Sequence, residues 1–489
     1  MSHIRNQNSM KAHHIPTHKT KVVCTIGPAT ESQEMLEQMI EAGMDIARLN
    51  FSHGDFQEHG EVIRRIRLAS EKTGKNVAIM VDLPGPKIRI GNLVQEDVQL
   101  EPGALFMLTS KEILGDASQV SVTLPNLHLV VHPGDILFIN DGLIQVKVER
   151  IEGEYVHCRV LVGGSLRSRK GLNLPKIDLG ISAFTEHDRR CMQFALEQGV
   201  DAISQSFVDD AKDIEDMRNA ANEMGYSPFI IAKIERASVI GKIDGVLEAA
   251  DGVMVARGDL GVEIPIEEIA IIQKNITAKA NLHGKPVITA TQLLESMVNN
   301  RRPTRAEATD VANAILDGTD CVMLSEESAL GKYPLEAVRM LVSIAKATEP
   351  HNVKKFYRQD SCNPCGIDIR EVDFITTSVA NIVSQSSNIA AILTPTDSGI
   401  TARKLSRFKL PVWILGVSSN KQTCQELIFS YGVFPIFEHM HPADWTDCAR
   451  DYALKYNIHG VSMVQTEGPS PENPFRNHKM EIITLRDVR

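Results

Sequence analysis

The segment FIIAKIE, residues 229–235, is an apolar, strand-like run that carries two charged residues, Lys233 and Glu235, on one face. An unpaired charge in an apolar interior costs several kcal/mol or shifts its pKa until the group is neutral. Two explanations are open: a buried Lys–Glu pair, or a third body, such as a metal ion or an anion, that binds both side chains. Because side chains at i and i+2 diverge slightly, a shared third body would satisfy both charges better.

Seven similar apolar runs accompany this segment, and amphipathic, helix-like stretches with a glycine just beyond their ends separate most of them. The eight runs are KVVCTIG (21–27), MDIARLNFS (44–52), NVAIMVD (76–82), AISQSFV (202–208), FIIAKIE (229–235), GVMVARGD (252–259), PVITATQ (286–292) and DCVMLSE (320–326). Alternating β and α segments are typical of parallel sheets, and eight repeats predict a closed (β/α)8 TIM barrel.

Two further regions extend this barrel. Residues 89–173 contain short strand-like runs with turn signals at EPGA, HPGD and EGEY, which predicts an inserted β-barrel lid domain on the active-site rim. After residue 349 a second α/β pattern predicts a separate domain. We therefore expect an N-terminal tail (1–20), a catalytic barrel (21–88 and 174–349), the lid (89–173) and a C-terminal α/β regulatory domain (350–489).

The composition points to an ordinary globular protein. Its 489 residues are 43% hydrophobic, and the formal net charge of −10 argues against a general nucleic-acid binder or a protein that binds anionic membranes. No apolar run approaches the ~20 residues that cross a bilayer, and the N-terminus lacks the apolar core of a signal peptide. We expect a soluble, cytoplasmic protein whose cysteines, such as Cys24, Cys191 and Cys321, are reduced core residues.

Two local patterns have competing explanations. Cys362 and Cys365 form a lone CxxC, which could bind zinc but lacks a second ligand pair and otherwise belongs to a polar loop. Histidines at 3, 13, 14 and 18 could bind metal adventitiously, and otherwise belong to a disordered tail.

Polar residues gather at the C-terminal ends of the barrel runs, which is where active sites of this fold lie. Any one of them could be a helix cap or a rim ion pair, but the pattern recurs around the barrel. The residues are Arg48, Asn50, Ser52, Asp82, Lys233, Glu235, Arg257, Asp259, Thr291 and Ser325.

Within this set, Glu235 and Asp259 are hard oxygen ligands from adjacent strands, which suits Mg²⁺ or Mn²⁺ better than zinc. Together with this metal, Lys233, Arg48 and the backbone of ARGDLG predict a strongly cationic mouth for a small carboxylate that carries phosphate. The chain has neither GxxxxGK[ST] nor GxGxxG, so no pattern shows nucleotide binding. The residues alone indicate a divalent-metal barrel enzyme that acts on a phosphorylated or enolisable acid.

Eight stretches, in order along the barrel, resemble the pyruvate kinase family: TIGPA, IARLNFSHG, GLNLP, AKIE, VARGDLGVEIP, ATQLLESM, RPTRAEATDVANA and MLSEESALGKYP. The resemblance covers nearly the whole chain after Lys21. It implies transfer of the phosphoryl group of phosphoenolpyruvate to ADP, giving ATP and pyruvate, as the last step of glycolysis. It also implies a homotetramer.

The resemblance further implies roles for individual residues. Glu235 and Asp259 would hold the divalent metal, and Lys233 would lie beside the transferring phosphoryl group. The backbone of Ala256, Arg257 and Gly258 would bind the substrate carboxylate, with Thr291 and Ser325 shaping the pocket in which the product carbon receives a proton. The residues expected to face phosphates, of substrate or nucleotide, are Arg48, Asn50, His53, Arg89 and Lys170.

Three features depart from the family pattern. The family commonly has LSGE where this chain has Leu324-Ser325-Glu326-Glu327, so Glu326 would bring an extra carboxylate near the pocket. Many relatives have LDTKGPEIR at residues 81–89 and need K⁺ at a site lined by the positions of Asn50, Ser52, Asp82 and Leu83. Here Leu83 and Lys87 replace threonine and glutamate, so we expect the Lys87 ammonium to replace K⁺. The alternative is that Lys87 only pairs with a lid carboxylate on the surface.

The third departure is in the C-terminal domain, which lacks the glycine-rich effector loop of fructose-bisphosphate-activated members. The segment TPTDSGITAR (394–403) could still offer Ser398, Gly399 and Thr401 to a phosphorylated effector, or it could be a capped helix start. Asp397 places a negative charge beside this loop, which disfavours a bisphosphate.

Two rival functions fit parts of the pattern. A divalent-metal aldolase or lyase of the phosphoenolpyruvate/pyruvate type would explain the metal pair but not a lid that carries Lys170. A catalytically silent metabolite sensor would explain the C-terminal domain but not the retained chemical residues.

Overall fold

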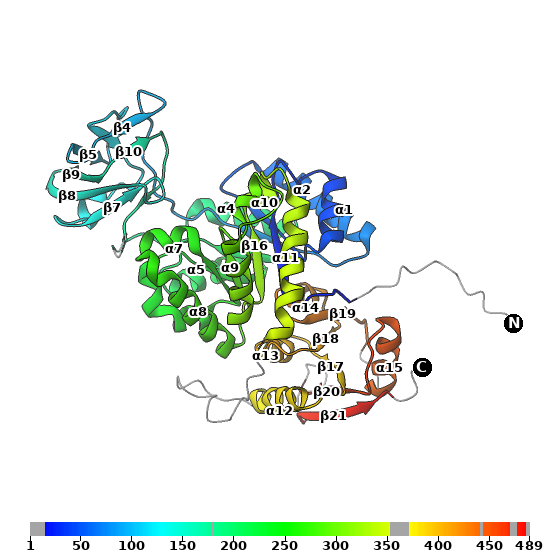
Figure 1. Cartoon of the computed structure of the whole chain (residues 1–489). Coiled ribbons are helices and arrows are strands. Elements are labelled where there is room, and N and C mark those ends of the chain that lie inside the picture. The colour runs from blue at the N-terminus through cyan, green and yellow to red at the C-terminus, as the bar shows by residue number, and fades with distance from the viewer. Residues whose placement is uncertain are drawn as a thin grey trace.

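The computed structural model describes residues 15–175, 177, 179–352, 371–440, 444–469 and 477–485. Eight parallel strands close into a barrel in the order β1-β16-β15-β14-β13-β12-β3-β2 (Figure 1). Their bounds are β1 Lys21–Thr25, β2 Ile46–Asn50, β3 Ala78–Asp82, β12 Ala202–Gln205, β13 Phe229–Ile234, β14 Gly252–Ala256, β15 Val287–Ala290 and β16 Cys321–Leu324. Each of the eight apolar runs contributes one strand, so the expected (β/α)8 barrel is confirmed.

Helices surround the barrel, and local sequence signals set their ends. Thr304 and Glu307 form a capping box at the start of α9, and Gly43 follows α1 at φ 123°, a conformation that favours glycine. The helices are α1 Gln33–Ala42, α2 Phe56–Thr73, α4 Glu186–Glu197, α5 Ala211–Glu223, α6 Ile243–Ala249, α7 Arg257–Glu263, α8 Ile269–His283, α9 Arg305–Asp317, α10 Glu326–Ala329 and α11 Pro334–Thr348. Short 3₁₀ turns lie at Ala237–Lys242, Ile266–Glu268, Glu295–Val298 and Glu349–His351.

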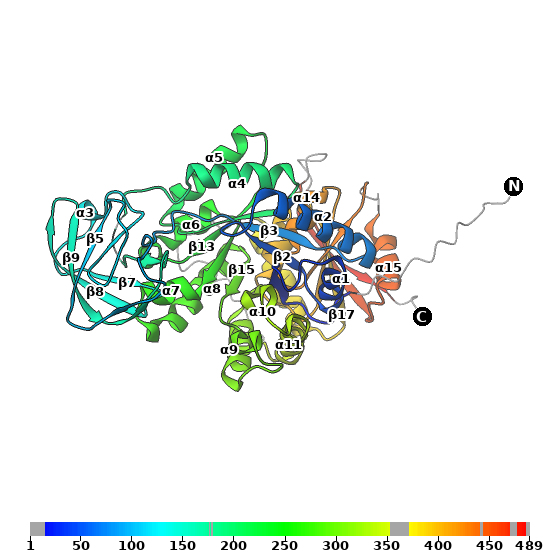
Figure 2. The same cartoon turned by 90° about the horizontal axis from the view of Figure 1, so that it is seen from above.

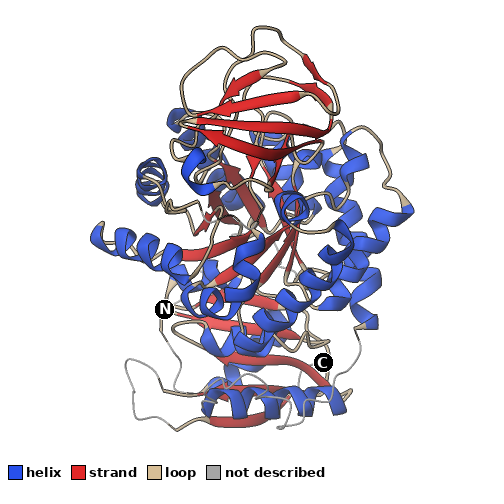
Figure 3. Ribbon diagram, turned by 90° about the vertical axis from the view of Figure 1, so that its left-hand side faces the viewer, coloured by secondary structure: helices blue, strands red, loops and turns tan. Residues whose placement is uncertain are grey.

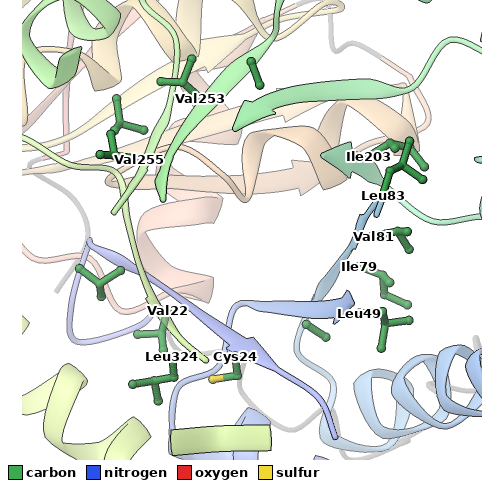
Figure 4. Close-up of a cluster of buried hydrophobic side chains, with 14 of the residues drawn as sticks. Val22, Cys24, Leu49, Ile79, Val81, Leu83, Ile203, Val253, Val255 and Leu324 are labelled. Atoms are coloured by element: carbon green, nitrogen blue, oxygen red, sulfur yellow. The ribbon is translucent and has the colours of Figure 1, made fainter. Parts of the chain in front are cut away.

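Side chains alternate between two cores along the barrel strands, as the two-residue period of a strand requires. One set packs outward against the helices, and Figure 4 shows members of it from several strands, including Val22, Val81 and Leu83. The other set fills the barrel interior and includes Phe229 and Ile231. Residues that continue this inward set at the C-terminal strand ends are therefore aimed at the barrel mouth.

The lid follows β3 and projects away from the barrel (Figures 1 and 2). It has a six-stranded sheet in the order β11-β7-β8-β9-β5-β6 and a two-stranded sheet of β10 and β4. Its elements are β4 Val98–Leu100, β5 Leu105–Thr109, β6 Gln119–Ser121, α3 Leu127–Val130, β7 Ile136–Ile139, β8 Ile144–Glu152, β9 Tyr155–Val162, β10 Gly164–Leu166 and β11 Leu172–Asn173.

The C-terminal domain lies at the opposite end of the barrel from the lid (Figure 3). Its five strands run in the order β19-β18-β17-β20-β21, with β21 antiparallel. Phe429 stacks on Phe229 of β13 with 5.4 Å between ring centroids, so this domain closes the bottom of the barrel. The elements are α12 Glu371–Gln385, β17 Ile389–Pro395, α13 Ile400–Ser406, β18 Trp413–Ser418, α14 Lys421–Leu427, β19 Val433–Phe437, α15 Trp445–Lys455, β20 Ser462–Glu467 and β21 Lys479–Thr484.

The local patterns have mixed outcomes. The expectation that His18 belongs to a disordered tail is wrong, because its side chain is buried with Nε2 3.9 Å from Asp45. The cysteines of the described ranges are free thiols, as expected, whereas Cys362 and Cys365 lie outside those ranges. None of the helices in the described ranges is long and apolar enough to cross a membrane.

Candidate active site

Lys233 is the centre of the site. It continues the inward set of β13 two residues beyond Ile231, and its ammonium lies 2.7 Å from Glu235 Oε1 and 3.4 Å from Asp82 Oδ2. It also donates a 2.7 Å hydrogen bond to Ser206 Oγ. Burial by itself lowers the pKa of Lys233, but the charges of Glu235 and Asp82 outweigh it and the pKa is raised. The lysine is therefore held as a buried ammonium.

Arg48 and Asp82 form the second ion pair of the mouth. Nε and Nη2 of Arg48 donate to Asp82 Oδ2 at 2.9 and 2.6 Å, and Nη1 donates to Thr25 Oγ1 at 2.8 Å. Burial by itself raises the pKa of Asp82. The positive charges of Arg48 and Lys233 act in the opposite direction, and the pKa of Asp82 is lowered overall. Arg48, on β2, therefore connects the C-terminal ends of β1 and β3 through its hydrogen bonds to Thr25 and Asp82.

Glu235 and Asp259 are the two candidate metal ligands. Glu235 is 2% exposed, and burial, followed by the negative charge of Asp259, raises its pKa against the opposing effect of Lys233. Asp259 lies in the first turn of α7 rather than on a strand, which corrects the sequence-based placement. Lys87 Nζ lies 3.7 Å from Asp259 Oδ1, and both side chains are about one-third exposed.

This pair of carboxylates fits a hard divalent cation. Two neighbouring negative charges, one of them buried, would be relieved by Mg²⁺ or Mn²⁺, which prefer oxygen ligands. Among the described residues no group of three or more His, Cys, Asp and Glu side chains is placed to hold a metal. Mg²⁺ commonly keeps several waters and takes substrate oxygens, so two protein ligands are compatible with it.

The charges of the mouth balance when no metal is counted. Three cations, Arg48, Lys233 and Lys87, lie against three carboxylates, Asp82, Glu235 and Asp259. The formal charges of this set cancel, so the strongly cationic mouth expected from the sequence depends on the bound metal. A bound divalent cation would restore a positive charge for an anionic ligand.

Thr291 and Gly258 lie next to the metal candidate Asp259, because Gly258 directly precedes it in the chain and contacts Thr291. Thr291 follows β15 with φ 67°, an uncommon conformation for a β-branched residue. Its hydroxyl accepts a hydrogen bond from Gly258 N at 2.8 Å and donates one to Ala290 O at 2.7 Å. The Arg257 side chain points away to Asp310, 2.6 Å distant, so Arg257 can offer only its backbone to a ligand.

Ser325 is the N-cap residue of α10, and its buried hydroxyl has no hydrogen-bond partner among the described residues. Its amide donates to Glu327 Oε2 at 2.8 Å, and Leu294 N donates to Glu327 Oε1 at 3.0 Å. Glu326 is exposed, whereas Glu327 is buried. The carboxylate that shapes this loop is therefore Glu327, and the extra Glu326 points to solvent.

The candidate phosphate-facing residues lie in two places. Ser52 and His53 are exposed in the loop after β2, where Asn50 Oδ1 accepts a hydrogen bond from Ser52 N at 3.2 Å. Arg89 pairs with Gly171 across the two chain segments that connect the lid, and Ile90 N donates to Lys170 O at 2.9 Å. These two pairings place Arg89 and Lys170 on neighbouring segments at the lid connection.

The candidate monovalent-cation residues lie at the ends of β2 and β3, where Asn50 and Asp82 are opposite each other in the register. Leu83 is fully buried in the outward core between barrel and helices, so only its backbone could line a site (Figure 4). Asp82 is engaged by Arg48, and Lys87 lies beside Asp259 instead of Asp82.

The candidate effector loop lies in the C-terminal domain, remote from the mouth (Figure 1). Ser398 is exposed and Gly399 adopts φ 77° at the start of α13. The Gly399 amide donates to Thr396 Oγ1 at 3.0 Å, so one expected backbone donor already has a partner.

Sequence reasoning missed Ser206 and Phe207, which follow β12. Ser206 accepts from Lys233, and the Phe207 amide donates to Glu235 Oε2 at 2.8 Å. A signal was present, because Ser204 and Ser206 place polar side chains at every second position of AISQSFV.

Comparison with known proteins agrees with this geometry. Residues 17–338 match the family model "Pyruvate kinase, barrel domain", and residues 373–471 match "Pyruvate kinase, alpha/beta domain". A pyruvate kinase of Thermococcus litoralis is 47% identical over 86% of this chain and 89% of its own length. One of Geobacillus stearothermophilus is 42% identical over 96% of this chain and 81% of its own. A crystal structure of a pyruvate kinase from Cryptosporidium parvum superposes with a TM-score of 0.89 at 33% identity, covering 96% of both chains.

A closed parallel barrel with a lysine–carboxylate cluster at its C-terminal mouth, together with these matches, defines a (β/α)8-barrel phosphotransferase. The chain belongs to the pyruvate kinase family.

Proposed function

We propose that this chain transfers the phosphoryl group of phosphoenolpyruvate to ADP, giving ATP and pyruvate. The observation that carries the proposal is the cluster of Lys233, Glu235 and Asp259 at the barrel mouth of a pyruvate kinase family member. An oxygen of the ADP β-phosphate attacks phosphorus, and the bond from phosphorus to the enol oxygen breaks. The enolate keeps the electron pair and then takes a proton at its methylene carbon.

Lys233 has the central role. Its ammonium stabilises the negative charge that develops on the transferring group and on the enolate oxygen. Because its position is set by protein contacts before substrate binds, little reorganisation is needed at the moment of transfer. Arg48 supports it by neutralising Asp82, which would otherwise repel phosphate.

Glu235 and Asp259 would hold Mg²⁺ or Mn²⁺, which when bound neutralises substrate oxygens. Lys87 supplies a fixed positive charge beside Asp259, and we include in the proposal that no K⁺ is required. The remaining assignments follow the family resemblance. Ala256, Arg257 and Gly258 offer backbone donors to the carboxylate, Thr291 and Ser325 line the proton-transfer pocket, Arg89 faces substrate phosphate, and Asn50, His53 and Lys170 face the nucleotide.

Thr291 links two of these tasks. Its hydroxyl accepts the hydrogen bond of the Gly258 amide, so a substrate carboxylate that binds this amide must displace the hydroxyl. The freed hydroxyl then turns toward the bound substrate.

A coupled assay tests the activity. With phosphoenolpyruvate, ADP and Mg²⁺, pyruvate should form together with ATP in equal amounts, and omission of ADP should stop both. Release of pyruvate from an aldol substrate without ADP would instead support an aldolase or lyase, and tight ligand binding without turnover would support a sensor.

The proposed assembly is a cytoplasmic homotetramer whose C-terminal domain binds a phosphorylated effector at Ser398, Gly399 and Thr401. Light scattering should give four times the monomer mass of 54.0 kDa. Ser398→Glu should abolish activation by any sugar phosphate or nucleotide that activates the parent protein. A monomer, or activation unchanged by the substitution, would contradict the corresponding part.

A further inference from the structure

Ser206, in the turn after β12, binds the Lys233 ammonium, and the family resemblance gives this serine no role. Ser206 is 3% exposed, and its hydroxyl has two partners. It accepts a 2.7 Å hydrogen bond from Lys233 Nζ and donates a 2.8 Å hydrogen bond to Leu83 O. Because Leu83 O takes the hydroxyl proton, the oxygen lone pairs are left for the ammonium.

The geometry of Lys233 makes this contact directional. Its ammonium has three N–H groups, and three acceptors surround it: Glu235 Oε1 at 2.7 Å, Ser206 Oγ at 2.7 Å and Asp82 Oδ2 at 3.4 Å. The two carboxylates each have a second charged neighbour. Glu235 lies near Asp259, and Asp82 is paired with Arg48. Ser206 is the neutral member of the three, so its contact stays the same when the charges around it change.

The backbone around Ser206 is built to keep it in place. Phe207 adopts φ 59°, an uncommon conformation for a bulky residue, and its amide donates to Glu235 Oε2. Gly85, at φ 65° in the segment that leads to the lid, packs so closely that an added Cβ would lie 2.9 Å from Phe207 and 3.1 Å from Ser206. One turn therefore contacts Lys233 of β13, Glu235 directly after this strand, and the segment that enters the lid.

We propose that Ser206 is a positioning residue that aims the Lys233 ammonium at the reacting group and ties its orientation to the Leu83–Lys87 segment at the lid entry. When a bound substrate attracts the Lys233 ammonium away from one carboxylate, the hydrogen bond to Ser206 is kept. The lysine side chain then reorients while it stays bonded to Ser206. This role rests on the proposed phosphoryl transfer.

The test compares Ser206→Ala and Ser206→Cys with the parent protein. Cysteine keeps nearly the same volume but is a weak acceptor, so it separates packing from hydrogen bonding. We expect both variants to lower kcat by about 10- to 100-fold, as for loss of a hydrogen bond to a charged group. KM for phosphoenolpyruvate should change by less than about 3-fold, because the contact acts on orientation. Ser206→Thr, which keeps the hydroxyl, should retain most of the turnover.

Ser430→Ala is the matched control, since Ser430 is equally buried but lies in the C-terminal domain, and its hydroxyl has no hydrogen-bond partner among the described residues. It should leave kcat unchanged. If Ser206→Cys keeps the parent turnover, or if it raises KM with kcat intact, the positioning role is wrong. If the parent protein itself shows no phosphoryl transfer, the proposed function fails instead. Should Ser206→Ala not fold, the cysteine variant still decides.

Discussion

At the residue scale, Lys233 combines burial with three acceptors, so substitution tests chemistry separately from folding. Lys233→Met should lower kcat by roughly 10²- to 10³-fold or more, as for loss of one preorganised group that stabilises developing charge. The fold should survive, because Asp82 Oδ2 keeps both hydrogen bonds from Arg48, and Glu235 keeps its hydrogen bond from the Phe207 amide and can take a proton. Steady-state kinetics and circular dichroism measure the two effects.

Lys279→Met is a matched control for this substitution. Lys279 pairs with Asp244 on the surface, where such pairs contribute ~0–1 kcal/mol, so turnover and fold should both persist. A folded Lys233→Met protein with parent turnover would remove Lys233 from the mechanism.

At the scale of elements, the lid-entry segment brings Lys87 beside Asp259 of α7, and this contact bears on cation use. We expect parent activity with Mg²⁺ in buffer free of K⁺ and NH₄⁺. Lys87→Glu removes a positive charge and adds a negative one that favours a diffusible cation. Its turnover should fall at least about 10-fold without K⁺ and recover on addition of KCl, as measured by a KCl titration at constant ionic strength.

Lys111→Glu is the control, because Lys111 is an exposed lid residue paired with Glu154, and the same charge change there should create no K⁺ dependence. Loss of parent activity in K⁺-free buffer, with recovery in KCl, would show that Lys87 does not replace the monovalent cation.

At the scale of the whole molecule, the C-terminal domain docks on the barrel bottom through groups that include a titrating carboxyl. Glu426 of α14 lies 3.7 Å from Arg403, and Gln422 connects it to Ser227 O of the barrel. Burial raises the pKa of Glu426 from 4.5 to about 7, with Asp251 adding to the effect and Arg403 opposing it. The folded protein therefore binds a proton that the unfolded chain has released.

This linkage predicts a pH-dependent stability. Because the folded pKa is the higher one, the contribution of Glu426 is fully present below pH 4.5 and is lost as the pH rises to about 7, which amounts to about 3 kcal/mol. Glu426→Gln removes this loss, so the midpoint of thermal unfolding of the variant should rise relative to the parent between pH 5 and pH 8.

Glu481→Gln, at an exposed position of β21, is the control and should shift the midpoint equally at both pH values. If the midpoint of thermal unfolding differs between Glu426→Gln and the parent by the same amount at every pH, the linkage is wrong.

The fold was largely predictable from local pattern. Strand-like runs and amphipathic helices depend on residue periodicity, and the period of two also determines that Lys233 and Glu235 share a face. Ligand types could be inferred as well, since carboxylates at strand ends suit Mg²⁺ whatever the details of packing. The resemblance supplied the roles of individual residues, which periodicity alone could not.

Tertiary structure decided which partners these side chains have. Ser206 contacts Lys233 across adjacent strands, and Lys87 meets Asp259 only because the lid entry folds over α7. The outward position of Leu83 and the exposure of Glu326 likewise depend on packing against neighbouring elements. By itself the sequence determined the strands, the helices and the kinds of chemical group at the barrel mouth, because these follow from local periodicity. Pairing of charges depends on distances between segments far apart in the chain, and those distances exist only once the barrel has closed.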